Sequence, residues 1–121
     1  MAWTVLLHPE FDPEFEELDE DVQDELLALL EMLAEYGPSL GRPHVDTLSG
    51  SKHANLKELR FKASGGVWRV AFAFDPERQA VVLVAGDKSG VSQDRFYRAL
   101  IKKAETRFDQ WLSALAPKKE K

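Results

Sequence analysis

The chain has 121 residues, no cysteine, a net charge of −5 and 44% hydrophobic residues. This length fits one domain with a substantial core, and the lack of cysteine excludes disulfides, thiol nucleophiles and thiolate metal sites. We find no signal-peptide pattern and no apolar run near the ~20 residues of a membrane span. We therefore expect a cytoplasmic, soluble domain over residues 1–116 and a charged tail over 117–121.

Charge is distributed unevenly along the chain. Residues 1–50 hold thirteen Asp or Glu and a single cation, Arg42, for a net charge of −12. The remainder holds fifteen Lys or Arg and eight acids, for a net charge of +7. A basic half in an acidic protein favours a polyanionic partner at one surface, although one-signed helices also serve solubility.

The first half predicts one strand and two helices. Trp3–His8 alternates in polarity as a strand does, and Pro9 ends it. Asp12 as a cap followed by Pro13 predicts a short helix over 13–18. Asp19 can cap a second helix that ends at Tyr36, before Gly37-Pro38. Apolar residues recur along it at helical spacing, which is typical of a helix that covers a sheet: Val22, Leu26, Leu29, Leu30 and Leu33.

Residues 37–55 are rich in Gly, Pro, Ser and Asn and predict a loop. The loop contains His44 and His53, with Lys52 beside the second. Two histidines could serve acid–base cleavage of RNA, but loop histidines are more often ordinary surface residues. No close His, Asp or Glu triplet supports a metal site, so we expect neither a metal nor a cofactor.

Three runs of β-branched and aromatic residues over 56–88 predict an antiparallel three-strand meander. Ala-Ser-Gly-Gly separates the first two runs, and Asp-Pro-Glu-Arg separates the last two. Trp68, Val70, Phe72 and Phe74 share one bulky, apolar face. The opposite face combines small residues with cations, and Arg60 and Arg69 both belong to it.

Two hairpin registers are open. A pairing of Lys62 with Val67 across a four-residue loop places Arg60 opposite Arg69, whereas a two-residue turn at Gly65-Gly66 places Arg69 opposite Lys62. Either register sets two cations side by side at a cost of up to ~1 kcal/mol. Such a face is either solvated or holds an anion. On an exposed face, Arg69→Ala would leave the fold nearly intact.

After Lys88, Ser92 can cap a last helix. Its apolar stripe predicts a core-facing side: Tyr97, Leu100, Ile101, Ala104, Phe108, Trp111, Leu112 and Leu115. Its cations are expected on the remaining faces, for solubility or as a phosphate-contacting row: Arg95, Arg98, Lys102, Lys103 and Arg107.

This order of elements resembles the RelE/ParE toxin superfamily. The stretches Leu56-Lys57-Glu58-Leu59-Arg60, Gly66-Val67-Trp68-Arg69-Val70-Ala71-Phe72 and Phe74-Asp75-Pro76 are most similar to its phage-derived, HigB-like branch. The resemblance covers about residues 3–112. It implies an α+β, RelE-like fold with an N-terminal strand, two helices, the three-strand meander and a C-terminal helix packed on one sheet face.

The resemblance also implies a function. It indicates the toxin of a type II toxin–antitoxin pair, a metal-independent endoribonuclease that cleaves mRNA, often on the ribosome, and inhibits translation. Its partner would be a cognate antitoxin, often a helix-turn-helix DNA-binding protein. Carried over residue by residue, the catalytic set is Arg60, Arg69, Lys88 and Tyr97. The RNA-binding candidates are Lys52, His53, Lys57, Lys62, Arg95, Arg98 and Lys102.

The chemistry of the arginines agrees with that role, because guanidinium groups match phosphate oxygens. The general base stays open among Lys88, Lys62, Tyr97 and His53. Asp87 could instead hold Lys88 in its charged form. Two alternatives also stay open: a ParE-like inhibitor of DNA gyrase without nuclease activity, and a non-catalytic RNA-binding module.

Overall fold

The structure is a computed structural model that describes residues 2–115. The predicted tail at 117–121 lies outside the described residues. The chain forms β1 (Thr4–Leu7), α1 (Phe11–Glu16), α2 (Glu20–Tyr36), the 3₁₀ turn η1 (Gly37–Ser39), β2 (Val45–Thr47), β3 (Leu56–Ala63), β4 (Gly66–Phe74), β5 (Gln79–Asp87) and α3 (Gln93–Leu115).

The strands form one five-stranded sheet in the order β1-β5-β4-β3-β2. Strands β3, β4 and β5 are the predicted antiparallel meander. β1 pairs in parallel with β5, and the short β2 pairs with β3 at the other edge. The predicted α+β fold is confirmed, with a mixed sheet that is one strand wider than expected.

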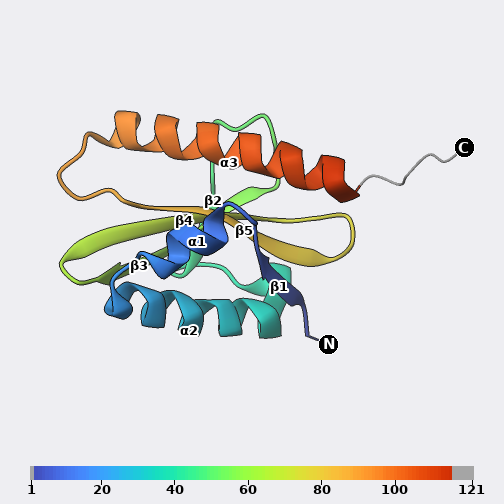
Figure 1. Ribbon diagram of the computed structural model, residues 1–121, viewed down its shortest axis with the longest axis horizontal. Helices are drawn as coiled ribbons and strands as arrows, with labels where there is room; N and C mark the ends of the chain where they lie inside the picture. The colour runs from blue at the N-terminus through green and yellow to red at the C-terminus, as the bar shows by residue number, and fades with distance from the viewer. Residues whose placement is uncertain (1, 116–121) are drawn as a thin grey trace, which may run out of the picture.

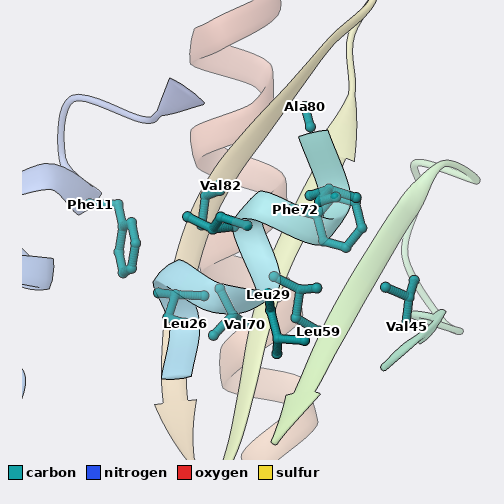
Figure 2. Close-up of a cluster of buried hydrophobic side chains, with 11 residues drawn as sticks. Phe11, Leu26, Leu29, Val45, Leu59, Val70, Phe72, Ala80 and Val82 are labelled. Carbon is teal, nitrogen blue, oxygen red and sulfur yellow. The ribbon is translucent and has the colours of Figure 1, made fainter. Parts of the chain in front are cut away.

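Helices cover both faces of the sheet, with α3 on one side and α2 on the other (Figure 1). The bulky face of β4 packs under α2, where Val70 and Phe72 contact Leu26 and Leu29 (Figure 2). The small-residue face packs under α3, where Ala71 and Ala73 adjoin the helix's apolar stripe. The predicted face assignment is confirmed, but much of the cationic face is covered by α3.

The β3–β4 turn fixes the register. Ser64 (φ 52°) and Gly65 (φ 76°) are its two central residues, and two positive φ values define the type I′ turn that suits the twist of a hairpin. Lys62 pairs with Val67 and Arg60 with Arg69. The first of the two predicted registers is therefore confirmed, and the turn at Gly65-Gly66 is wrong. The predicted four-residue loop is a two-residue turn, because Ala63 also pairs with Gly66.

Two local predictions need correction. α1 begins at Phe11, two residues before the predicted start, because its N-terminal turn is closed by amides that bond to the His8 carbonyl. The segment over 37–55 is not all loop, since it contains η1 and β2. Pairing with β3 creates β2 from a segment with little strand pattern of its own. No helix among residues 2–115 is long and apolar enough to cross a membrane.

Candidate phosphate-binding site

Strands β3 and β4 and the segment before β2 enclose a shallow depression of about 360 Å³. Its lining residues are Arg42, Pro43, Arg60, Phe61, Lys62, Val67 and Arg69. Four of these seven residues are cations and none is acidic. Arg60 and Arg69 are direct cross-strand partners within it. This combination suits an anionic ligand of the size of a phosphate with its sugar.

A buried carboxylate, that of Glu58, lies beside the two arginines. Glu58 is only 5% exposed and belongs to the same face of β3 as Arg60. Its Oε2 lies 3.9 Å from Nε of Arg60, and its Oε1 lies 3.9 Å from Nε of Arg69. The Tyr97 hydroxyl donates a hydrogen bond to Glu58 Oε1 (2.9 Å) and accepts one from Arg69 Nε (3.1 Å). Tyr97 thus ties α3 to the site.

Burial raises the pKa of Glu58, whereas the hydrogen bond from Tyr97 and the nearby Arg69 and Arg60 charges act in the opposite direction. Burial dominates because, at 3.9 Å, neither guanidinium donates a hydrogen bond to this carboxylate. The pKa of Tyr97 is also raised, first by burial and then by its bond to Glu58. Both effects favour the protonated phenol of Tyr97.

Arg69 is not the exposed side chain that the strand pattern predicts. It is 7% exposed, because α3 crosses its face of the sheet and Tyr97 packs over it. Its Nη1 also donates to the carbonyl oxygen of Trp68 (2.9 Å). We expected Arg69→Ala to leave the fold nearly intact because we expected an exposed side chain. The predicted exposure of Arg69 is wrong. Arg60 keeps about a third of its side chain exposed and lies 3.5 Å from Asp46.

Comparisons with known proteins identify the family. A family model described as phage derived protein Gp49-like matches residues 13–109. The chain belongs to the Gp49-like family. Two Mycobacterium tuberculosis proteins are similar to it: "Putative toxin HigB2", 43% identical over 105 residues, and "Putative toxin HigB3", 39% identical over 110 residues. The alignments cover 86% and 91% of this chain. The chain spans about half of HigB2 (52%) but 94% of HigB3.

Solved structures show the same fold at low sequence identity. A mutant of the Escherichia coli toxin RelE in its free state superposes with a TM-score of 0.61 at 15% identity, covering 85% of this chain and 97% of RelE. RelE in an archaeal RelE–RelB complex from Pyrococcus horikoshii gives 0.55 at 18% identity, covering 75% and 100%. The predicted membership of the RelE/HigB-type toxin family, with its fold, is confirmed.

In this Gp49-like chain, the four predicted catalytic residues gather at one end of the meander. Arg60, Arg69 and Tyr97 form the contacts described above. Lys88 directly follows β5, and its amide donates to the Val67 carbonyl oxygen (2.8 Å), which places it beside the depression. Its Nζ lies 3.3 Å from Gln93 Oε1. Asp87 does not hold it, because that carboxylate accepts from the Val67 and Ser89 amides.

The predicted RNA-binding residues do not form one surface. Lys62 lines the depression, but Lys57 lies on the opposite face of β3, toward α2. Lys52 and His53 are both paired with Asp109 of α3, at 2.8 Å each. Strand alternation places Lys57 and Lys62 on opposite faces of β3. Lys52 and His53 meet Asp109 because α3 returns along the sheet.

The predicted cations of α3 also point in different directions. Arg95 and Lys102 line depressions on the β5 side of the helix, separate from the arginine pair. Arg98 is exposed and lines neither. Arg107, expected on an outer face, is buried and bonded to Glu14. Its spacing from Ala104 and Trp111 follows the apolar stripe, but the charge of Arg107 led to its assignment to an outer face.

Three residues of the site were given no role by the sequence alone: Glu58, Asp46 and Arg42. Glu58 did carry a signal, since it is the one acid on the cationic face of the first meander strand. Asp46 and Arg42 carried none, because they come from the segment predicted as loop. Asp46 accepts a hydrogen bond from Arg42 (3.0 Å) and so links β2 to the depression.

Proposed function

We propose that this protein is the toxin of a type II toxin–antitoxin pair and cleaves mRNA without a metal ion, which inhibits translation. The observation that carries the proposal is the joint projection of Arg60 and Arg69 into one open, cationic depression. Family membership and the similarity to the HigB proteins support the same function. Its partners would be mRNA on the ribosome and a cognate antitoxin with a helix-turn-helix DNA-binding domain.

The chain's own groups match the steps of RNA cleavage. The ribose 2′-hydroxyl loses its proton and attacks the adjacent phosphorus, the bond to the 5′-oxygen breaks, and that oxygen takes up a proton. Arg60 and Arg69 would stabilise the charge that builds on the phosphoryl oxygens. The products are a 2′,3′-cyclic phosphate and a 5′-hydroxyl end.

Side chains around the two arginines would donate and accept the protons of the cleavage reaction. Tyr97, which as a phenol carries its proton at neutral pH, suits the donor to the leaving 5′-oxygen. Lys88 or Lys62, acting as the uncharged amine, would take the proton of the 2′-hydroxyl and become an ammonium group. Glu58 lies beneath the depression and acts as a positioning residue through Arg69 and Tyr97. His53 is excluded from this role by its place in the Asp109 pair, away from the arginines.

The test is induction of the protein in bacterial cells, followed by primer extension on several mRNAs and analysis of the new ends. We expect discrete cuts within coding regions, with 2′,3′-cyclic phosphate and 5′-hydroxyl termini. Intact mRNA together with a DNA-damage response would instead assign the protein to gyrase inhibition. Binding of RNA without cuts, in cells or with purified ribosomes, would leave only an RNA-binding module.

A further inference from the structure

The two lysines that are candidates for the base lie on either side of Val67, which lines the depression. Lys62 pairs with Val67 across the β3–β4 hairpin. On the other side of β4, directly after β5 ends, the Lys88 amide donates to the Val67 carbonyl oxygen (2.8 Å). Both lysines therefore border the depression, and they differ in how firmly the fold holds each of them.

The carboxylate of Asp87 ties the chain around Lys88 to β4. Its Oδ1 accepts hydrogen bonds from the Val67 amide (3.0 Å), the Ser89 amide (3.0 Å) and the Ser89 hydroxyl. These bonds, the one from the Ser89 hydroxyl most, lower the pKa of Asp87 and so favour its charged form. Together with the bond from the Lys88 amide, they engage both main-chain groups of Val67 and both sequence neighbours of Lys88.

Gly66 leaves the space that this carboxylate occupies. A Cβ at Gly66 would lie 2.6 Å from Oδ2 of Asp87 and 2.8 Å from Nε1 of Trp68, closer than non-bonded atoms approach. Gly66 lacks the positive φ of its neighbour Gly65, so close packing rather than backbone conformation requires a glycine here. One oxygen of Asp87 is therefore hydrogen-bonded, and the other is packed against the start of β4.

Lys88 is held at its amine as well as at its main chain. Its Nζ lies 3.3 Å from Oε1 of Gln93, the first residue of α3. Successive residues of a strand point to opposite faces, so the Asp87 carboxylate fixes the Lys88 main chain from the other face. Within the described part of the chain, no ion pair joins the two side chains. Lys88 is half-buried, whereas Lys62 is exposed beside the turn.

We propose that Lys88, rather than Lys62, is the base for the 2′-hydroxyl and that Asp87 is the positioning residue that holds it there. This proposal rests on the proposed RNA cleavage and assigns one of its steps. The uncharged Lys88 amine takes the 2′-hydroxyl proton as the 2′-oxygen bonds to phosphorus, the bond to the 5′-oxygen breaks, and that oxygen takes a proton from Tyr97. Proton transfer needs the amine within hydrogen-bond reach of the hydroxyl, so a loosened Lys88 would slow this step.

Variants of Asp87 test the positioning role. Single-turnover cleavage of a defined RNA by the full chain, with purified ribosomes present, gives the rate at saturating RNA and the RNA concentration for half that rate. Asp87→Ala removes every bond of the carboxylate, and we expect the saturating rate to fall about 10–10²-fold with half-saturation changed less than about threefold. Asp87→Asn is the matched control, because its amide oxygen can accept the same hydrogen bonds, and it should keep the rate within about threefold of the wild type. Thermal unfolding checks that each variant is folded in the assay.

A chemical replacement of lysine tests which amine is the base. The chain has no cysteine, so Lys88→Cys carries a single thiol, and 2-bromoethylamine converts it to a lysine analogue whose amine is less basic. We expect Lys88→Cys to lose cleavage about 10²-fold or more and the modified protein to regain most of it. The rise of the rate with pH should then occur at lower pH than in the wild type. The same treatment of Lys62→Cys should leave the position of this rise unchanged.

Two results would overturn the proposal. Equal cleavage by Asp87→Ala and Asp87→Asn would show that the bonds of the carboxylate do not position the base. An unshifted pH dependence after modification of Lys88→Cys would remove Lys88 as the base, and a shift with Lys62→Cys would transfer the role to Lys62. Absence of cleavage by the wild-type protein would reject the proposed function itself, whereas these results, obtained with active wild type, reject only the roles of Lys88 and Asp87.

Discussion

Two arginine side chains, that of Arg69 on β4 and that of Arg107 on α3, are buried between α3 and the sheet and differ in how fully they are hydrogen-bonded. Arg107, 5% exposed, donates hydrogen bonds to both carboxylate oxygens of Glu14 and to the Leu83 carbonyl oxygen, the last at 2.8 Å. Among the described residues, Arg69, 7% exposed, donates only to Tyr97 and to its own strand at Trp68. Its nearest carboxylate oxygen, on Glu58, is 3.9 Å away.

The difference distinguishes an arginine that holds the fold together from one that keeps hydrogen-bond donors available for a ligand. A guanidinium has five N–H donors, and Arg107 makes three hydrogen bonds, two to a carboxylate and one to a carbonyl at a point where β5 carries an extra residue against β4. Arg69 makes two hydrogen bonds within residues 2–115 and borders an open depression. Its remaining donors can bind a phosphate without breaking the fold.

Replacing Arg69 should have the largest effect, and on activity. Arg69→Lys keeps the charge but loses the two-pronged geometry, and we expect RNA cleavage to fall about 10²–10³-fold. Single-turnover cleavage of a defined RNA by the purified variant measures this. Thermal unfolding serves as the control, because the lysine variant should remain folded at the assay temperature. Wild-type cleavage by this variant would reject the assigned role.

Replacing Arg107 should instead act on stability. Arg107→Ala leaves the Leu83 carbonyl oxygen and the Glu14 carboxylate without their partner, and we expect a loss of about 2–3 kcal/mol in the free energy of unfolding. The Glu14 side chain, 42% exposed, can turn to water, which limits the loss. Urea unfolding measures it. Cleavage per folded molecule should stay near the wild-type value, and a selective loss of cleavage would break the contrast between the two arginines.

The pH dependence of stability tests Glu58. Its pKa in the folded protein is raised above the usual 4.5, so the folded state binds more protons than the unfolded state just above pH 4.5. The contribution of Glu58 to wild-type stability therefore falls as the pH rises through this window, and Glu58→Gln should gain stability relative to the wild type over the same range. Unfolding midpoints of both proteins from pH 4 to pH 8 measure this.

Asp75 provides a control, because its pKa is shifted in the direction opposite to that of Glu58. Burial opposes its ionisation, but hydrogen bonds from Trp111, Gln79 and two backbone amides outweigh burial and lower its pKa below 3.8. Its contribution to stability is present above pH 3.8 and is lost as the pH falls through the folded-state pKa. Asp75→Asn should therefore lose relative stability as the pH rises. Parallel slopes for both variants would contradict the environment described for Glu58.

The smallest expected effect concerns Asp46, which partly neutralises Arg42 and Arg60 at the depression. Asp46→Asn should raise affinity for a short single-stranded RNA by roughly threefold at low salt and should steepen its salt dependence. Fluorescence anisotropy titrations at several salt concentrations measure both. Glu77→Gln, which removes an equal charge in the exposed β4–β5 turn, should leave both unchanged.

The sequence alone determined the meander, both major helices and the face on which Arg60 and Arg69 meet. These features depend on local periodicity, caps and turns, and a strand's period of two assigns every side chain to a face once the strand is recognised. The resemblance of the motifs around Arg60 and Arg69 then indicated the RelE/HigB-type family.

Only the tertiary structure decided which cations share a surface and which are bonded internally. Lys52, His53 and Arg107 were assigned outward from local pattern, but their carboxylate partners are 57, 56 and 93 residues away in sequence. The burial of Arg69 and Glu58 likewise depends on α3 returning across the sheet. Pairing between distant segments leaves no local pattern, because it is set by packing of the whole chain.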